Sequence, residues 1–245
     1  ALSAANPESR SPADISSAIE FLEKLFEVRH SANAKSLVSA SECCLSGASL
    51  CEQIDQRRQR IDEIAESHPA LKGFLVGSFD PLLINLVDRA RALYEKHSLS
   101  FENEISLCSR ALSPSDYGFH NVMRRTDGRL VFLDFEYFGW DDPVKLTSDF
   151  LWHPGHVLSL SEREQFESAM KKLYQADSGF QQRLSALYPL YGLRWCLILL
   201  NEFLPERWFR RVYSGSKKDM ESAQAAQLEK AERLLTVVDQ ECARA

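Results

Sequence analysis

The chain has 245 residues, of which 44% are hydrophobic and 26% are charged, with a formal net charge of −6 and a pI of about 5.6. These values are ordinary for a globular protein of one large domain or two small ones. The acidic balance argues against a nucleic-acid-binding protein, which usually carries a basic surface. No apolar run approaches the roughly 18 residues of a membrane-spanning helix, so we expect neither nucleic acid nor a membrane as a partner.

The N-terminal residues 1–13 are small and polar and include two prolines, so we expect a linker or tail. They contain no basic segment followed by an apolar one and therefore do not resemble a signal peptide. A first helix is predicted after Asp14, as its N-cap, because apolar residues recur at helical spacing from Ile15 to Phe26. This helix opens the folded part of the chain, residues 14–245.

Further helices are predicted on both sides of a less regular middle section. One covers about residues 50–67, and the next begins at Asp80-Pro81, with Asp80 as N-cap and the proline at the first helical position, and runs to about Lys96. The later helices are expected from the capping box Ser161-Glu-Arg-Glu164 and over about residues 179–203 and 217–242. The pattern indicates an α+β fold that is mainly helical.

The middle section contains a strong signal for a β-hairpin. Asp127-Gly128 separates the short apolar pair Val122-Met123 from the apolar run Leu130–Phe135. An Asp-Gly pair between two such segments is typical of a tight hairpin turn. We therefore expect one small hairpin embedded among the helices.

Polar residues with a distinctive spacing flank this hairpin. Asp116 is followed five residues later by Asn121, and Asp134 ends the returning strand. Phosphoryl transfer needs a carboxylate that orients the attacking hydroxyl and oxygen ligands that hold Mg²⁺ on the phosphates. A loop base, an amide and a strand-end carboxylate, brought together by a hairpin, would meet both needs. The alternative is that the three are a turn residue, a cap and a strand terminator.

These motifs resemble a known family. Asp116, Asn121 and Asp134-Phe135-Glu136 are similar to the catalytic and metal-binding motifs of the aminoglycoside phosphotransferase and choline kinase family, whose members have a protein-kinase-like fold. The segments that follow, GWDDP at residues 139–143 and SDF at 148–150, resemble the Gly-Asp-Pro and Asp-Leu-Ala segments of that family. The resemblance covers about residues 14–240, with its specific motifs confined to 112–150.

The resemblance implies roles for individual residues. Asp116 would be the catalytic base, and Asn121 and Asp134 would be Mg²⁺ ligands in the ATP site. Apart from the resemblance, His120 lies beside Asn121 and could contact phosphate, although such a residue more often packs in the loop. Asp149 would be structural, bonding back to the backbone of the catalytic loop.

The chain departs from the family in two places. The catalytic loop has Pro114-Ser115-Asp116 where the family usually has His-x-Asp, so the geometry of the loop is in question more than the base. No G-x-G-x-x-G motif and no strand lysine of the V-A-I-K type precede the loop, so the N-terminal ATP-binding lobe is absent from this chain. We expect the parent protein to carry that lobe before Ala1, and the alternative is a C-terminal lobe used alone.

Several residues have two interpretations. Glu136, Asp141 and Asp142 would attract a cationic substrate if they line a cleft, or they form a solvated acidic loop. Trp195 could offer an aromatic face to a quaternary ammonium group, or it packs in the core of its apolar helix.

Histidines and cysteines raise the question of a transition-metal site. His153 and His156, in WHPGH, are either a metal pair or two imidazoles around a Pro-Gly turn, and no third ligand is evident from the sequence. Cys43, Cys44 and Cys51 could bind a metal, but their spacing does not match the usual zinc patterns. The six cysteines are more typical of scattered core thiols in a reducing compartment, so we expect a cytoplasmic protein.

The functional prediction is a small-molecule kinase that uses ATP and Mg²⁺ to phosphorylate a substrate hydroxyl, although the isolated lobe could need its N-terminal partner for activity. The sequence does not choose the substrate among an amino sugar, a choline-like amine, a homoserine-like amino acid and another sugar alcohol. The alternative is a kinase-like binding module, a pseudokinase or scaffold without its own grip on ATP. A hydrolase that uses Asp116 and Asp134 as paired carboxylates is a third class, but it leaves Asn121 and the hairpin unexplained.

Overall fold

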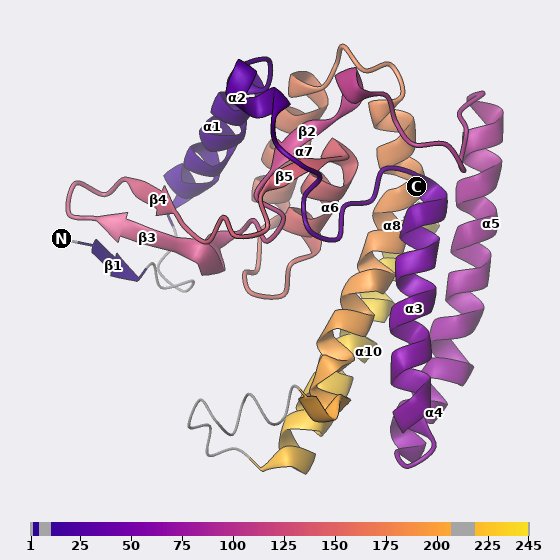
Figure 1. Cartoon of the computed structure of the whole chain (residues 1–245). Helices are drawn as coiled ribbons and strands as arrows, with labels where there is room; N and C mark the ends of the chain where they lie inside the picture. Colours follow the sequence, from indigo (N-terminus) through magenta and orange to yellow (C-terminus); the bar gives the residue numbers. More distant parts are fainter. Residues whose placement is uncertain (1, 5–10, 207–218, 245) are drawn as a thin grey trace. The chain divides into compact units, whose positions relative to one another are not determined.

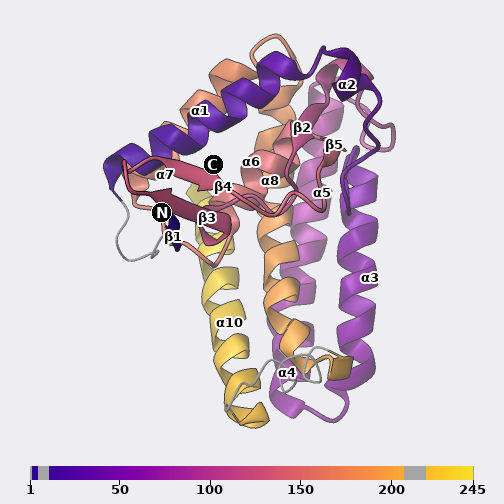
Figure 2. The same cartoon turned by 60° about the vertical axis from the view of Figure 1, so that its left-hand side comes forward.

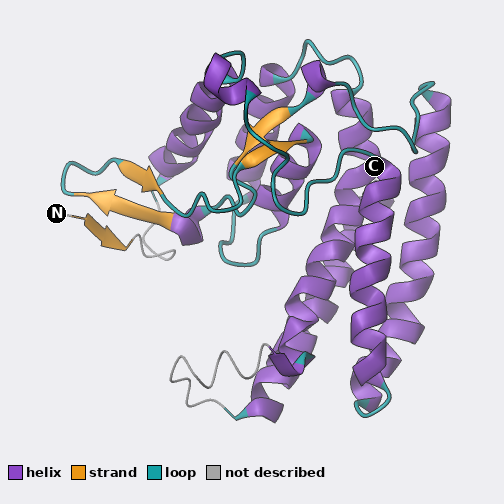
Figure 3. Cartoon of the chain, viewed as in Figure 1, coloured by secondary structure: helices purple, strands orange, loops and turns teal. Residues whose placement is uncertain are grey.

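The structure, a computed structural model, describes residues 2–4, 11–206 and 219–244 (Figure 1). It is mainly helical with two small antiparallel sheets, as Figure 3 shows, so the predicted fold class is confirmed. The chain divides into two compact units. The first combines residues 1–46 with 103–184, and the second combines 47–102 with 185–245.

Among the described residues, the first unit holds strands β1 to β5 together with the helices α1, α6 and α7 (Figures 1 and 2). Its helices are α1 (Pro12–Val28), α2 (Ala32–Lys35), α6 (Pro143–Trp152), α7 (Leu160–Leu173), the short η3 (Leu107–Ser109) and η4 (Phe119–Asn121), and the first turn of α8 (Phe180–Leu199). Its strands are β1 (Leu2–Ala4), β2 (Ala111–Ser113), β3 (Val122–Arg125), β4 (Leu130–Phe132) and β5 (Gly139–Asp141).

The predicted hairpin is present as β3 and β4, paired in antiparallel register with Val122 opposite Phe132. Gly128 has φ of +84° in the turn, a conformation that glycine adopts without a steric penalty. A third strand, β1, pairs with the other edge of β3. Leu2–Ala4 therefore forms a strand where the sequence indicated a linker or tail, and residues 5–10 of that segment lie outside the described residues.

Two predicted helix starts are displaced. Helix α1 begins at Pro12 with Ser11 as its N-cap, and Asp14 lies at the third position, where its carboxylate accepts a hydrogen bond of 2.9 Å from the backbone N–H of Ser11. Helix α7 begins after Ser159, whose capping-box partner is Glu162. The sequence SLSERE contains the S-x-x-E pattern twice, two residues apart, so the motif alone could not choose between them.

The second unit is built from long helices. They are α3 (Gly47–Ala65), α4 (Pro69–Phe74), the π-helical η2 (Leu75–Phe79), α5 (Asp80–Lys96), the remainder of α8, η5 (Leu200–Phe203) and α10 (Met220–Arg244). Figures 1 and 2 show these helices running alongside one another. The predicted helices near 50–67, 179–203 and 217–242 correspond to α3, to α8 with η5, and to α10, and residues 217–218 lie outside the described residues.

Asp80 is not the N-cap of a separate helix, contrary to the prediction from Asp80-Pro81; it is the first residue of α5, which continues directly from α4 and η2. The helix is continuous from Pro69 to Lys96, and Asp80 has helical backbone angles within it. Proline has no backbone N–H with which to bond the preceding turn of a helix. Pro81 is accommodated inside this continuous helix directly after the wider, π-helical turns of η2. The carboxylate of Asp80 instead accepts two hydrogen bonds from Arg58, at 2.8 and 2.9 Å.

This continuous helix is also the one stretch among the described residues that is long and apolar enough, by those two criteria alone, to cross a membrane. Only 28% of its most apolar window is buried within the protein. The predicted helix start at Asp80-Pro81 falls inside this stretch, so the sequence pattern did not indicate one segment of this length. Length and composition are weak evidence, because core helices of soluble proteins also meet them.

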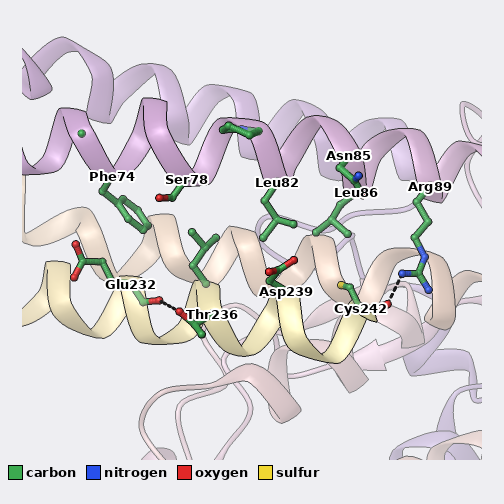
Figure 4. Close-up of a pocket in the computed structure, with 13 residues that line it drawn as sticks. Phe74, Ser78, Leu82, Asn85, Leu86, Arg89, Glu232, Thr236, Asp239 and Cys242 are labelled. Carbon is green, nitrogen blue, oxygen red and sulfur yellow. Dashed lines mark hydrogen bonds between the residues drawn. The ribbon is translucent and has the colours of Figure 1, made fainter. Parts of the chain in front are cut away.

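A groove lies between the α4–η2–α5 helix and α10 in the second unit (Figure 4). Its volume is about 870 Å³, and Arg89 closes one end by donating a hydrogen bond of 2.6 Å to the backbone oxygen of Cys242. Leu82, Leu86 and Leu235 contribute apolar side chains, and Glu232 and Asp239 contribute carboxylates.

Candidate active site

The loop that follows β2 carries the first predicted site residue, and local hydrogen bonds hold its shape. The buried hydroxyl of Ser113 accepts a hydrogen bond of 3.0 Å from the backbone N–H of Ser115. Ser115 has φ of +68°, in the left-handed region that is unfavourable for residues other than glycine, and its hydroxyl donates to the backbone oxygen of Ser41 at 3.1 Å. Such a conformation persists only where the surroundings impose it, so the loop before Asp116 is tightly constrained.

Tyr117 anchors the other side of Asp116. Its ring lies in an aromatic cluster with Phe21, Phe132 and Phe150, with ring centroids 5.0 to 5.6 Å apart. Its buried hydroxyl donates a 2.8 Å hydrogen bond to the backbone oxygen of Ala18 on α1. The aromatic ring is held inside the unit while the neighbouring Asp116 side chain remains 43% exposed and open to solvent.

The D-x4-N spacing brings Asp116 and Asn121 into contact, as the sequence predicted. The amide nitrogen of Asn121 donates to the backbone oxygen of Asp116 at 3.0 Å and to its Oδ2 at 3.3 Å. The Nε2 atom of His120 lies 3.1 Å from the other carboxylate oxygen of Asp116. The hydrogen bond with His120, aided by the nearby imidazole of His153 and the Asn121 amide, lowers the pKa of Asp116, so its carboxylate is ionised at neutral pH.

The hairpin returns the chain to this loop. The backbone N–H of Leu133 donates to the backbone oxygen of Asn121 at 2.9 Å, which places Asp134 one residue beyond a direct contact with the loop. Asp134 itself has φ of +63° and an exposed side chain. Among non-glycine residues this conformation is strained, and strained residues cluster at functional sites.

Several of the predicted site carboxylates affect the exposed hydroxyl of Tyr137. The pKa of the Tyr137 hydroxyl is raised, first by its interaction with Glu136 and then by the charges of Asp134 and Asp116. Three predicted site carboxylates, from the loop and from the segment after the hairpin, therefore act on the same exposed hydroxyl. With its nitrogen committed to Asp116, Asn121 can offer a cation its amide oxygen, and Asp134 can offer a carboxylate.

Asp141 and Asp149 occupy a different environment, in a buried ion-pair network. The ammonium group of Lys145 lies 3.2 Å from Oδ2 of Asp141 and 3.1 Å from Oδ2 of Asp149. Asp141 also accepts a 3.0 Å hydrogen bond from the backbone N–H of Cys44. Burial raises the pKa of Asp141, against the opposing effect of Lys145. The structural role of Asp149 through the catalytic-loop backbone stays a prediction; the contact observed here is with Lys145.

Asp142 is the N-cap of α6 and is equally enclosed. Its carboxylate accepts a 2.8 Å hydrogen bond from the backbone N–H of Val144 and pairs with the guanidinium of Arg183 at 3.2 Å. Arg183 also pairs with Asp177 at 3.0 Å, so one arginine joins α6 to the start of α8 within the first unit. These contacts explain the GWDDP segment as a helix cap with two internal ion pairs.

The acidic residues proposed to attract a substrate therefore separate into two groups. Asp141 and Asp142 are only 0% and 1% exposed, so neither carboxylate can meet a substrate. Each instead neutralises a buried cation, Lys145 or Arg183, and the expected substrate-attracting role is therefore wrong for both. Glu136 is exposed and keeps this role as a prediction. Trp195 belongs to the second unit, where it is 8% exposed on α8, consistent with the core-packing interpretation.

His153 and His156 join the site in a way that the sequence did not show. The imidazole of His153 stacks on that of His120 with ring centroids 3.9 Å apart, and its Nε2 lies 3.8 Å from Oδ1 of Asp116. Burial, and then the charge of His120, lower the pKa of His153 to about 4. The sequence signal was present in WHPGH, but only folding places it against a residue 33 positions earlier.

No protein-family model matches the sequence, and no curated protein matches it either. Solved structures do match. A spectinomycin phosphotransferase in complex with ADP and spectinomycin has a TM-score of 0.56 at 11% identity, over 97% of this chain and 69% of that one. An ethanolamine kinase from Plasmodium vivax has a TM-score of 0.52 at 15% identity, over 93% of this chain and 61% of that one.

The match covers nearly all of this chain but only about two thirds of each solved structure. This agrees with the resemblance that the motifs around Asp116 and Asp134 suggested. At such low identity the comparison concerns the fold alone. The chain shares its fold with a large part of the spectinomycin phosphotransferase and ethanolamine kinase structures.

Proposed function

We propose that this chain is the catalytic lobe of a phosphotransferase that transfers the γ-phosphate of ATP to a hydroxyl group of a small molecule. The observation that supports it most directly is the junction at Asn121. This residue binds Asp116 through its side-chain amide and Leu133 through its backbone oxygen, so it links the proposed base to the segment after β4 that carries Asp134. The fold shared with spectinomycin phosphotransferase and ethanolamine kinase agrees with that chemistry.

Asp116 is the residue that meets the substrate in this proposal. Its carboxylate is ionised, partly exposed and held on two sides by His120 and Asn121. It accepts a hydrogen bond from the substrate hydroxyl and orients that oxygen toward the γ-phosphorus. It takes the proton as the new O–P bond forms and the bond from the γ-phosphorus to the bridging oxygen breaks, releasing ADP. A base with a low pKa suits a loose transition state, because the proton leaves the hydroxyl late in the reaction.

Asn121 and Asp134 would hold Mg²⁺. An amide oxygen and a carboxylate are the hard oxygen donors that Mg²⁺ prefers. Asp134, with its strained backbone and exposed side chain, lies two residues beyond Phe132, where β4 ends, and not at the strand end that the sequence predicted. When bound, the ion would neutralise charge on the phosphate oxygens. The 245 residues contain neither the Gly-rich loop nor the strand lysine that would bind the phosphates of ATP. The proposal therefore includes a further lobe that supplies both motifs.

A kinase-like binding module is the second candidate. It is favoured by the same missing motifs and by Pro114 in place of the family histidine. The two candidates differ in a single property, namely turnover of ATP by the full-length parent protein.

The test is phosphate transfer from ATP by the full-length protein to a panel of hydroxyl compounds that includes amino sugars, choline and ethanolamine. Asp116→Asn and Asp134→Asn should each lower kcat by about a hundredfold or more, because each removes a charge on which the transition state depends. Asp88→Asn, on the exposed surface of α5, is the matched control and should leave turnover unchanged. Full turnover in both site variants would exclude this assignment, and absence of ATP turnover in the wild-type protein would favour the binding module.

A further inference from the structure

Three imidazoles gather behind the proposed base. His120 comes from η4, and His153 and His156 come from the loop between α6 and α7. The rings of His120 and His153 are parallel within 2°, and the rings of His153 and His156 lie 5.3 Å apart and within 13° of parallel. One ring nitrogen from each residue lies within 4.8 Å of those of the other two.

Hydrogen bonds select the nitrogen that two of these rings would present to a ligand. The Nε2 atom of His120 faces the carboxylate of Asp116 at 3.1 Å, and the Nε2 atom of His156 faces the backbone oxygen of Phe150 at 2.9 Å. Both partners are acceptors, so each neutral imidazole carries its proton on Nε2 and its lone pair on Nδ1. Metal-binding histidines commonly have this arrangement, in which a carboxylate or backbone oxygen holds the other N–H and fixes the ring.

The Nδ1 atom of His120 provides independent support. It is buried, and it has no hydrogen-bond partner among the residues that the structure describes. A buried polar atom without a partner calls for an explanation, because its desolvation is not compensated. A bound ion would supply the missing partner.

His153 would complete the set if its Nδ1 atom gave up its present hydrogen bond for a metal ion. Its Nδ1 accepts a hydrogen bond of 2.9 Å from the backbone N–H of Gly155, and its Nε2 points to Asp116 at 3.8 Å. If Nδ1 turned from Gly155 to a metal, Nε2 could still donate toward the same carboxylate. Three nitrogens around a tetrahedral zinc ion lie about 3.4 Å from one another. Binding would therefore bring the nitrogens closer together and rotate the stacked rings of His120 and His153 out of parallel, so that their in-plane lone pairs converge on the ion.

Two glycines leave room for the imidazoles. A Cβ atom at Gly118 would lie 2.8 Å from Nδ1 of His120 and 2.9 Å from Cε1 of His156. At Gly155 it would lie 2.6 Å from Cε1 of His153. Neither position accepts a larger side chain without moving an imidazole, so both glycines belong to the same cluster.

We propose that His120, His153 and His156 form a binding site for a divalent transition-metal ion of the zinc type. Three imidazole nitrogens and an open fourth position favour Zn²⁺ and its neighbours in the first transition row over Mg²⁺ or Ca²⁺, which prefer oxygen ligands. The site is distinct from the proposed Mg²⁺ ligands Asn121 and Asp134. His120 connects the two regions, because its other nitrogen holds Asp116.

Cysteines do not contribute to this site. None of the six cysteines forms a disulfide, and Cys43, Cys44 and Cys51 are not gathered into a set of metal ligands in the part of the chain that the structure describes. This distinction has a spectroscopic consequence, since thiolate and imidazole ligands give different charge-transfer spectra with Co²⁺.

The experiment is a titration of the chelator-treated protein with Co²⁺, followed by visible absorption, and then displacement by Zn²⁺. We expect one Co²⁺ per chain with the intense visible bands of a four-coordinate ion and without a thiolate charge-transfer band. Variants His153→Ala and His156→Ala should each weaken binding at least about tenfold, while His97→Ala, an exposed histidine on the second unit, should not change it. None of these readouts depends on phosphotransferase activity.

Gly118→Ala tests the geometry without removing a ligand. Gly118 has extended backbone angles that alanine also adopts, so the added methyl group acts mainly by crowding His120 and His156. It should weaken Co²⁺ binding while circular dichroism and the melting temperature show a folded chain. Absence of the visible bands in the wild-type protein, the appearance of a thiolate band, or equal affinity of the His97 and His153 variants would each overturn the proposal.

Discussion

The side-chain nitrogen of Asn121 lies 3.0 Å from the backbone oxygen of Asp116 and 3.3 Å from one of its carboxylate oxygens. This pair links the loop after β2 to the hairpin, because the backbone oxygen of Asn121 also accepts the N–H of Leu133. A residue five positions after a carboxylate thus holds both that carboxylate and the strand end that follows the turn. The contact between Asn121 and Asp116 explains the D-x4-N spacing structurally, whether or not Asn121 also binds a cation.

Asn121→Ala should therefore impair catalysis more than its small change in volume suggests. It removes both hydrogen bonds to Asp116 and the proposed amide ligand, so kcat of the full-length protein should fall by about a hundredfold. Steady-state kinetics of phosphate transfer, compared with Asn85→Ala on the exposed face of α5, provide the measurement. A variant with unchanged kcat would show that Asn121 only supports the loop.

Tyr117→Phe should lower stability while leaving the aromatic cluster intact. The change deletes a buried hydroxyl whose hydrogen bond to Ala18 is 2.8 Å long, at an expected cost of about 1 kcal/mol. For a chain of this size that corresponds to a melting temperature lower by about 2–4 °C. Tyr137→Phe, at a 43% exposed position, is the control and should change stability by less than about 0.5 kcal/mol. An equal effect of the two substitutions would contradict the anchoring role of Tyr117.

Lys145→Met should be severely destabilising. It leaves the carboxylates of Asp141 and Asp149 buried without their shared cation, a change that typically costs about 3–5 kcal/mol. Lys171→Met, which breaks an exposed pair with Glu167 on α7, should cost less than about 1 kcal/mol. Urea denaturation of the two variants compares their free energies of unfolding. A small loss of stability for Lys145→Met would mean that the two carboxylates become protonated or hydrated once the Lys145 ammonium is gone.

The pair between Asp14 and Arg124 should make stability sensitive to acid. Burial alone would raise the pKa of Asp14, but hydrogen bonds from Arg124 and Ser11 outweigh it and lower the pKa below 3.8. A carboxyl group whose pKa is lowered by folding stabilises the protein above its unfolded value of 3.8, and that contribution is lost as the pH falls through the folded pKa.

Asp14→Asn is the matching variant. At pH 7 it should lose about 1.5–3 kcal/mol, the usual contribution of a charged hydrogen bond, and its stability should then fall less steeply below pH 4 than that of the wild-type chain. Asp62→Asn, in the exposed pair with Arg58, should change neither property measurably. Parallel acid slopes in the wild-type and Asp14 variants would show that other carboxyl groups dominate the response.

Local patterns in the sequence were sufficient for much of this description. Apolar periodicity predicted the long helices, and Asp127-Gly128 predicted the hairpin, because both depend on residues that are neighbours in the chain. The spacing of Asp116, Asn121 and Asp134 was readable for the same reason. The exact helix starts were not, since SLSERE satisfies the capping pattern twice and Asp80-Pro81 occurs inside a continuous helix.

Burial and long-range contact were decided only by the tertiary structure. Asp141 and Asp142 look like a solvated acidic loop in the sequence, yet Lys145 and Arg183 neutralise them in the interior of the first unit. His120 approaches His153 because the loop and the α6–α7 connection fold against each other. The sequence by itself determined which local elements form and which reactive groups they carry. The tertiary structure decided which of those groups meet water, a cation or one another, because the free energy of a charge depends on partners that are distant along the chain.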